Sequence, residues 1–269
     1  MTPLVIGVTS HRNLCAREIE PIRQRVRNFF AQLKHDFPEL PLVLLSALAE
    51  GGDQMVAQEA LAIGARLIAP LPLPRDMYVE DFTDPAVHAS FDALCRHAQI
   101  VQLSLQAGQS QPVIMPPGTA RDRQYAQAGV YIASHCHILL AIWDGKASDR
   151  LGGTAQVVAY HLGGAMPGLV ERRRSSQHHV LGGGDERLLY HIVCSRNDVG
   201  GEPAAGLLPL HAMWCTADSA VAADSGMPAG FHLMFARMAE FNAECGKYAT
   251  AIADAAPGHL DARLDSTVT

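Results

Sequence analysis

The chain has 269 residues, of which 48% are hydrophobic, and this suits one large domain, or one domain with a small appendage, around a sizeable core. Only 18% of the residues are charged, which excludes a largely disordered or coiled-coil protein. The net charge of −6 argues against general nucleic-acid binding, although backbone amides of an acidic protein can still bind one small anion.

The cysteines, the N-terminus and the most apolar stretch of the sequence together predict a cytoplasmic protein. The six cysteines are scattered without a C-x-x-C pair, which predicts reduced thiols. The N-terminus runs directly into an apolar segment and shows no basic leader or cleavage site. The most apolar long stretch, 129–143, is shorter than a membrane span and contains two histidines, so we expect no membrane segment.

Short apolar runs alternate with helical patterns through the first two-thirds of the chain. The predicted strands are 4–8, 42–45, 66–71, 100–103, 138–143 and 188–194. The predicted helices are about 18–35, 53–63, 85–97, 121–134, 153–162 and 230–253. This alternation predicts a Rossmann-like, doubly wound α/β fold with a mostly parallel sheet, helices on both faces and a C-terminal helix.

Segments without such periodicity are interpreted as connections. A Gly/Pro/Gln-rich loop is predicted at 106–119, and a surface loop that contains ERRRSSQHHVLGGGD is predicted as an insertion at about 164–186. We therefore expect a single domain over 1–256, followed by a tail over 257–269.

Ligands of open parallel sheets bind at the carboxyl ends of the strands, and three turns occupy such ends. The first turn reads GVTSHR, and its candidate ligand-binding residues are Gly7, Thr9, Ser10, His11 and Arg12. Gly7 would allow close backbone approach, the hydroxyls would hydrogen-bond, and Arg12 could pair with phosphate. An ordinary strand-to-helix turn with an exposed arginine explains these residues equally well.

The second turn reads SALAEGGD and follows the second predicted strand. Its candidates are Ala49, Glu50, Gly51 and Asp53. Two glycines beside two carboxylates are compatible with a ribose or phosphate contact, and Glu50 could accept hydrogen bonds from sugar hydroxyls. The more frequent role of an aspartate in the place of Asp53 is to cap the helix that it precedes.

The third turn, WDGKASDRLGGTA, follows the most apolar strand. Its candidates are Trp143, Asp144, Gly145, Gly152, Gly153 and Thr154. Because the last three open a helix, their N–H groups and the helix dipole would form an anion site. Thr154 could equally be a simple N-cap. Each turn alone is weak evidence, and the three together favour nucleotide binding.

The sequence lacks the signature motifs of several common functional sites. The chain contains no G-x-S-x-G, no complete Walker A loop and no G-x-G-x-x-G. His135, Cys136 and His137 look like metal ligands, but the two histidines stand two residues apart beside a buried strand and would point to opposite sides. We therefore expect neither a metal nor an obligatory cofactor.

An ordered set of motifs resembles the SLOG superfamily. The strings are IGVTSHR, LSALAEGGDQMVAQEAL, PLPLP followed by Y-x-x-DF, ILLAIWDG and GGTAQVV. YHIVCSR and EFN are similar to late motifs of its prokaryotic branch, whose members carry GVTGHR where this chain has Ser10 in place of the usual glycine. The resemblance spans about residues 4–245.

This Rossmann-like superfamily includes lonely-guy phosphoribohydrolases, DNA-processing DprA proteins, the ligand-sensing regions of melastatin-type TRP channels and bacterial anti-phage effectors. The resemblance implies binding of a nucleotide or a nucleotide-derived second messenger, of the cyclic ADP-ribose or oligonucleotide type. It also implies control of an effector domain or partner protein, which this chain does not itself contain, and we expect a homo-oligomer.

The chain departs from the lonely-guy enzymes at their catalytic motif, PGGxGTxxE. Aligned on Gly153-Thr154, the glutamate of that motif falls on Val157, and the preceding Arg-Lys pair maps to Arg123-Gln124. The resemblance thus adds Arg123 as a candidate phosphate ligand, while the acid/base residue is lost. This favours binding over that hydrolysis.

Three functions remain open on the sequence. The favoured one is a regulatory sensor that binds a nucleotide messenger and so controls an effector. The second is an N-glycosidase or phosphoribohydrolase acting on a nucleoside monophosphate or an NAD-like substrate, with Glu50, Asp53 or Asp144 as the acid/base. The third is an assembly module with a vestigial pocket.

Overall fold

A single mixed sheet forms the centre of the molecule. The computed structural model describes residues 1–82, 84–171 and 187–255, and its strands follow the order β4-β3-β2-β1-β5-β6-β7-β8. They comprise β1 (Leu4–Ser10), β2 (Leu42–Leu45), β3 (Arg66–Leu71), β4 (Ala98–Gln102), β5 (Ile138–Trp143), β6 (Leu188–Val193), β7 (Ala212–Cys215) and β8 (Ala220–Ala222). β1 to β6 run parallel, whereas β7 and β8 extend the sheet antiparallel.

The strand order reverses at β1, which pairs with β2 on one side and β5 on the other. The chain first builds β1 to β4 in one direction and then crosses back to place β5 and β6 beyond β1. The crevice between β1 and β5 is therefore the topological switch point, where open α/β sheets bind their ligands.

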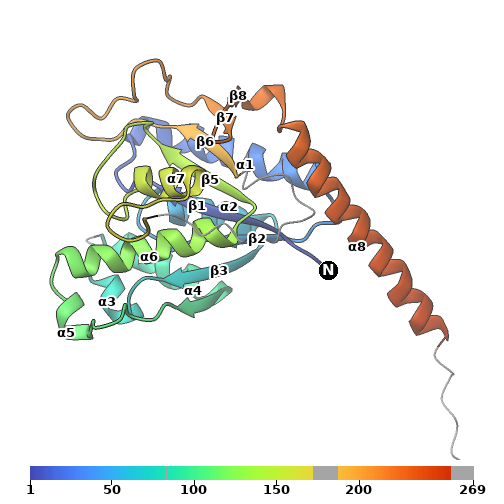
Figure 1. Ribbon diagram of the computed structural model, residues 1–269, viewed down its shortest axis with the longest axis horizontal. Helices are drawn as coiled ribbons and strands as arrows, with labels where there is room; N and C mark the ends of the chain where they lie inside the picture. Colours follow the sequence, from blue (N-terminus) through green and yellow to red (C-terminus); the bar gives the residue numbers. More distant parts are fainter. Residues whose placement is uncertain (83, 172–186, 256–269) are drawn as a thin grey trace, which may run out of the picture.

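Helices cover both faces of the sheet (Figure 1). They are α1 (Ile19–Asp36), α2 (Gly52–Ala62), α3 (Arg75–Val79), α4 (Pro85–His97), α5 (Gln111–Ile114), α6 (Thr119–His135), α7 (Thr154–Gly163) and α8 (Ala229–Ala255). Helices α1, α2 and α4 share one apolar core with Leu4, Ile6 and Val8 of β1, and α6 and α7 share a second core on the opposite face. Alternate side chains of the strands thus enter two cores, which confirms the predicted Rossmann-like α/β fold.

The local predictions differ from the structure at several places, including the end of β1, which extends two residues beyond its predicted bound to Ser10. β4 begins two residues before its predicted start, α3 follows the Pro-rich segment, and α5 lies inside the predicted loop 106–119. β7 and β8 were not predicted, because four and three residues carry too little periodicity to be recognised. Most of the predicted insertion, residues 172–186, and the predicted tail lie outside the described residues.

The C-terminal helix α8 begins against the sheet and ends away from it. Phe231 and Phe235 are buried. The Asn242 side-chain amide accepts a hydrogen bond from the Thr2 N–H and donates one to the Thr2 carbonyl oxygen. Figure 1 shows the remainder of α8 extending away from the other elements. Among the described residues, none of the helices combines the length and apolarity needed to cross a membrane.

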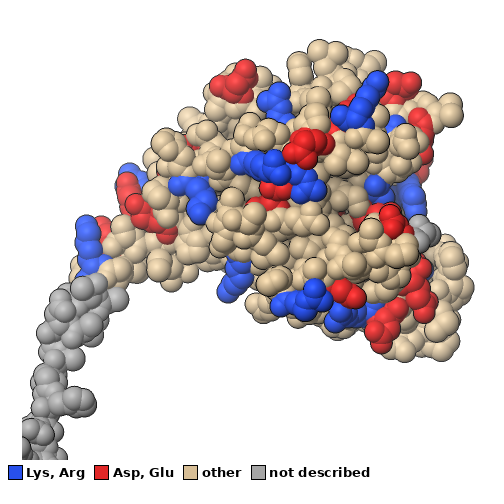
Figure 2. Space-filling view, turned by 180° about the vertical axis from the view of Figure 1, so that it is seen from behind, with Lys and Arg blue, Asp and Glu red and all other residues tan. Residues whose placement is uncertain are grey.

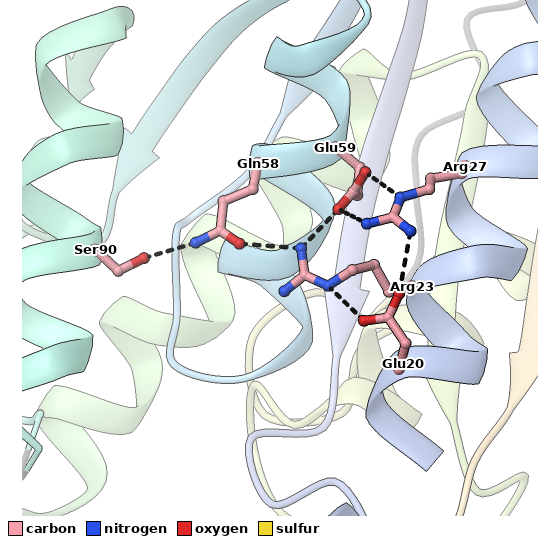
Figure 3. A network of polar contacts seen from close by, with 6 residues as sticks. All are labelled: Glu20, Arg23, Arg27, Gln58, Glu59 and Ser90. Carbon is pink, nitrogen blue, oxygen red and sulfur yellow. Dashed lines mark hydrogen bonds and ion pairs between the residues drawn. The ribbon is translucent and has the colours of Figure 1, made fainter. Parts of the chain in front are cut away.

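Charged side chains of both signs share the surface. On the face shown in Figure 2, basic and acidic residues are interspersed among uncharged ones. One such group ties three helices together: Glu59 of α2 accepts hydrogen bonds from Arg23 and Arg27 of α1, and Gln58 reaches Ser90 of α4 (Figure 3). The group fixes the helices of one face relative to one another.

Candidate functional site

A cleft of about 550 Å³ opens at the switch point between β1 and β5. The ends of these two strands form its floor, and the N-terminus of α7 and the side of α6 form one wall. The first turn of α2 and the end of α3 contribute further residues. Its volume falls within the range of small-molecule sites.

Asp53 is one of the two buried acids among the described residues of the cleft. It is 5% exposed in the first turn of α2, and the Ser10 hydroxyl at the end of β1 donates to its Oδ1 over 2.6 Å. Burial raises the pKa of Asp53 to about 7, although the Ser10 hydrogen bond and the positive charge of Arg12 act in the opposite direction. Its side chain does not cap α2, since the cap position belongs to Gly51. A buried carboxyl group with this pKa is suited to proton transfer at neutral pH.

Asp144, at the end of β5, holds the opposite side of the floor. Its carboxylate lies 3.1 Å from His11 Nε2 and 3.0 Å from Arg196 Nε, and it accepts a hydrogen bond from the Lys146 amide. Burial opposes the ionisation of Asp144, but the Lys146 amide, His11 and Arg196 outweigh it and lower its pKa. Asp144 is therefore an ionised anchor that joins the ends of β1, β5 and β6.

The N-terminus of α7 faces the cleft with fewer open amides than the sequence suggests. The Gly153 N–H already donates to Arg150 O over 3.0 Å, and the Gly152 N–H donates to Gln156 Oε1 over 3.3 Å. Thr154 is the first residue of α7 and not its cap, and its hydroxyl donates to Ser10 O over 2.8 Å. The amides of Thr154 and Ala155, which open the helix, are those left for an anion.

Aromatic and basic side chains of α3, α6 and the turn after β1 also line the cleft. The guanidinium of Arg12 lies 5.5 Å from the centre of the Tyr125 ring. Tyr78 is fully buried and, among the described residues, its hydroxyl has no hydrogen-bond partner. Arg121 is also buried, but it is engaged with Asp81 at 2.8 Å and with three carbonyl groups. Within the described residues, Arg12, Lys146 and Arg150 are cleft cations without an ion pair, although the Lys146 ammonium group donates to Gly200 O over 2.8 Å.

The structure brings together most, but not all, of the predicted site residues. Those that line the cleft are Thr9, Ser10, His11, Arg12, Ala49, Asp53, Asp144, Gly152, Gly153 and Thr154. Those that do not line it are Gly7, Glu50, Gly51, Arg123, Trp143 and Gly145. Arg123 is exposed on α6, two residues from the buried Arg121.

Two glycines that looked like ligand contacts have packing roles. A Cβ on Gly7 would lie 2.7 Å from Ile132, so this glycine admits α6 against β1 and not a ligand. Gly152 has a φ of +74°, and a Cβ there would meet the Ala126 backbone nitrogen at 2.7 Å. Both glycines therefore set the distance between α6 and its neighbours.

Sequence reasoning missed several cleft residues. Tyr78 and Asp81 lie within the Y-x-x-DF string, and Arg196 within YHIVCSR, so motif strings marked these three without a role. No local pattern distinguishes Tyr125 or Arg150 from an ordinary surface residue. Within the described residues, no group of three or more His, Cys, Asp or Glu side chains could hold a metal ion.

The sheet and the cleft define a Rossmann-like α/β protein with a site at the switch point. No protein-family model matches the chain, and no curated protein matches it. Among solved structures, it is similar to the DNA processing protein A (DprA) of Streptococcus pneumoniae, at 17% identity and a TM-score of 0.33. The match covers 52% of this chain and 41% of that protein, so the chain matches less than half of the DprA length.

Proposed function

We propose that the cleft binds a small anionic ligand of the nucleotide type. The observation that carries the proposal is the combination, at one switch point, of the open N-terminus of α7 with Arg12 and Arg150, which have no ion pair among the described residues. A phosphate would accept hydrogen bonds from the Thr154 and Ala155 amides and pair with these cations. Tyr125 would contact the base.

The ligand would act as a signal that regulates an effector. It would contact residues at the ends of β1 and β5 together with α7, while Asp144 already links the β1, β5 and β6 ends. Binding would thus select one arrangement of these loops, and an effector could respond to that population shift. The resemblance to SLOG proteins favours a messenger of the cyclic ADP-ribose or oligonucleotide type, as in anti-phage defence.

One observation supports a second candidate, an N-glycosidase. Asp53 lines the cleft with a pKa of about 7 and could donate a proton to a departing base, while water attacks the sugar. The other two carboxylates are less suited to this role. Asp144 has a lowered pKa and is held by His11 and Arg196, and Glu50 does not line the cleft.

The two functions are separated by one assay on the full chain. Purified protein is incubated with nucleotides, NAD derivatives and cyclic messengers, and thermal stability and product release are followed together. A ligand that raises the melting temperature without turnover supports the sensor. Release of free base or ribose phosphate that is abolished by Asp53→Asn supports the N-glycosidase. Neither stabilisation nor turnover by any member of the panel would contradict both.

The position of the phosphate is tested with two arginine variants. Arg12→Ala removes a cleft cation and should weaken binding of the stabilising ligand about 10- to 100-fold, the value of one charge-assisted hydrogen bond. Arg123→Ala is the matched control, because Arg123 is also exposed but does not line the cleft. Equal affinities of the two variants would place the phosphate elsewhere.

A further inference from the structure

Helix α8 presents two different apolar faces. One face docks on the body of the protein through Phe231, Phe235 and Ala239, with the buried Asn242 continuing it. The residues recur at three- and four-residue intervals and so lie on one side of the helix. This face explains how α8 is attached, but it accounts for only part of the apolar surface of the helix.

The second face is a stripe that the body leaves uncovered. We call it the α8 stripe, and its described members are Met234, Met238, Phe241, Cys245 and Tyr248. Their spacing of four, three, four and three residues is the heptad pattern of helices that pair along a seam. Phe241 is 56% exposed and Tyr248 is 71% exposed, whereas Met238 at the edge of the docked face is partly buried.

Within the part of the chain that the structure describes, the outer part of α8 has no cover from the sheet or from the other helices. Every residue from 243 to 248 is exposed, and Figure 1 shows this part of the helix projecting from the body. A helix segment of this kind is marginal in water without packing on its apolar side. Exposed aromatic and sulfur-containing side chains in one stripe mark a contact surface.

We propose that the α8 stripe packs antiparallel against the α8 stripe of a second copy of this chain. The charged residues beside the stripe support this occupant. Arg237 and Glu244 are seven residues apart on the same flank, away from the docked face, and the ion pair of Arg237 with Glu240 of its own helix, at 3.0 Å, is exposed. When two helices pair antiparallel about a twofold axis near Phe241, Arg237 of each copy meets Glu244 of the other. A parallel pair would instead bring Arg237 toward the flank of Phe235 and Asn242.

This interface is separate from the cleft, and its test does not depend on the ligand. The mass of the full chain in solution is measured by light scattering and sedimentation across a concentration series. We expect a dimer, and Phe241→Glu combined with Tyr248→Glu should shift it to a monomer. Ala243→Glu is the matched control, because Ala243 is exposed on the far side of the same helix and should leave the dimer intact.

Circular dichroism and thermal melting of each variant verify that loss of the dimer is not loss of the fold. A wild-type chain that stays monomeric at every concentration overturns the proposal. So does a dimer that survives the double substitution in the stripe.

The antiparallel arrangement is tested by exchanging the flanking charges. Arg237→Glu or Glu244→Arg alone should weaken the dimer, and the two together should restore it because the pair is re-formed with reversed signs. Failure to restore the dimer contradicts the antiparallel pair. Rapid oxidation to a dimer bonded through Cys245 of both copies would also contradict it, because an antiparallel pair with its axis near Phe241 holds the two Cys245 residues about two helical turns apart.

Discussion

The carboxyl group of Asp53 is removed from water by the first turn of α2 and the end of β1. At 5% exposure it retains the Ser10 hydrogen bond but loses most of the solvation that an ionised carboxylate requires. Its pKa of about 7 follows from this placement, and it makes the stability of the protein sensitive to pH.

Asp53→Asn should therefore stabilise the protein progressively as pH rises. The folded state retains the Asp53 proton up to pH of about 7, whereas the unfolded chain loses it near 3.8. The raised pKa contributes its full stability to the wild-type fold below the pKa of the unfolded chain. This contribution is lost as pH rises through the pKa of the folded protein, and the loss is on the order of 4 kcal/mol at most. Asparagine mimics the protonated acid and avoids this loss.

The measurement is urea unfolding of both proteins at pH 5 and at pH 8. We expect the free energy of unfolding of Asp53→Asn to increase relative to that of the wild type from pH 5 to pH 8. Ser148→Ala, an exposed change at the mouth of the cleft, serves as the control and should show no such trend. An unchanged difference between Asp53→Asn and wild type would show that Asp53 is ionised at both pH values.

At the scale of elements, the glycine before α2 fixes how closely that helix approaches the turn that follows β1. Gly51 has a φ of +90°, and a Cβ there would lie 2.4 Å from the Arg12 carbonyl oxygen. Gly64 follows the same helix with a φ of +80°, but a Cβ there would meet nothing within 4 Å. Alanine substitutions at Gly51 and Gly64 therefore separate the energetic cost of a left-handed backbone conformation from the cost of a steric clash.

Gly64→Ala should destabilise the protein by about 1–2 kcal/mol, the cost of a left-handed conformation for alanine. Gly51→Ala should cost clearly more, because the Arg12 backbone must also move, and it should weaken ligand binding through the displaced turn. Chemical denaturation of both variants measures the difference. Equal losses would mean that the β1–α1 turn yields to the added methyl group without cost.

The packing of α1 on α2 depends on Glu59, whose side chain is 10% exposed between Arg23 and Arg27 (Figure 3). Burial opposes its ionisation, but the two arginines outweigh burial and lower its pKa. Glu20 contacts the same arginines from the surface, at 69% exposure. The two glutamates share partners and differ in burial.

Glu59→Gln should cost about 1–3 kcal/mol near neutral pH, because it breaks a largely buried charge network. Glu20→Gln should cost less than about 0.5 kcal/mol, as expected of an exposed pair. Since the lowered pKa contributes stability only while Glu59 is ionised, the gap between wild type and Glu59→Gln should close as pH falls through that pKa. Thermal melting of both proteins over a pH series measures this difference in stability. A difference that stays constant with pH would mean that Glu59→Gln destabilises the protein through packing and not through charge.

At the scale of the whole molecule, charge limits the partners. The net charge of −6 and the interspersed signs on the face of Figure 2 provide no extended basic surface there. A phosphate polymer would gain little from such a surface, whereas a single phosphate group could still be held by local amides and two arginines.

We therefore expect duplex DNA to bind no more tightly than the weak end of non-specific affinities, a Kd of about 10⁻⁴ M at physiological salt. Fluorescence anisotropy of a labelled duplex, titrated with the full chain at several salt concentrations, measures this. Tight binding with a steep salt dependence would show a basic surface that the net charge conceals.

The alternation of apolar runs with helical stripes was sufficient to predict most of the fold. A strand buried on both faces, such as β5, must be continuously apolar, and a helix packed on a sheet must carry one apolar stripe, so both patterns are local. The three turns were recognised for the same reason, since each follows a strand directly.

The tertiary structure decided which residues face the cleft. Gly7 and Glu50 stand in the same turns as Ser10 and Asp53, yet only the second pair lines the cleft. Tyr125 and Arg150 reach it because α6 and the turn before α7 pack near β1. Burial, pKa and ion pairing depend on contacts between distant segments, such as Asp144 with Arg196. The sequence determined most of the elements and the ends of the strands that border the cleft, and packing between them determined the chemistry of each side chain.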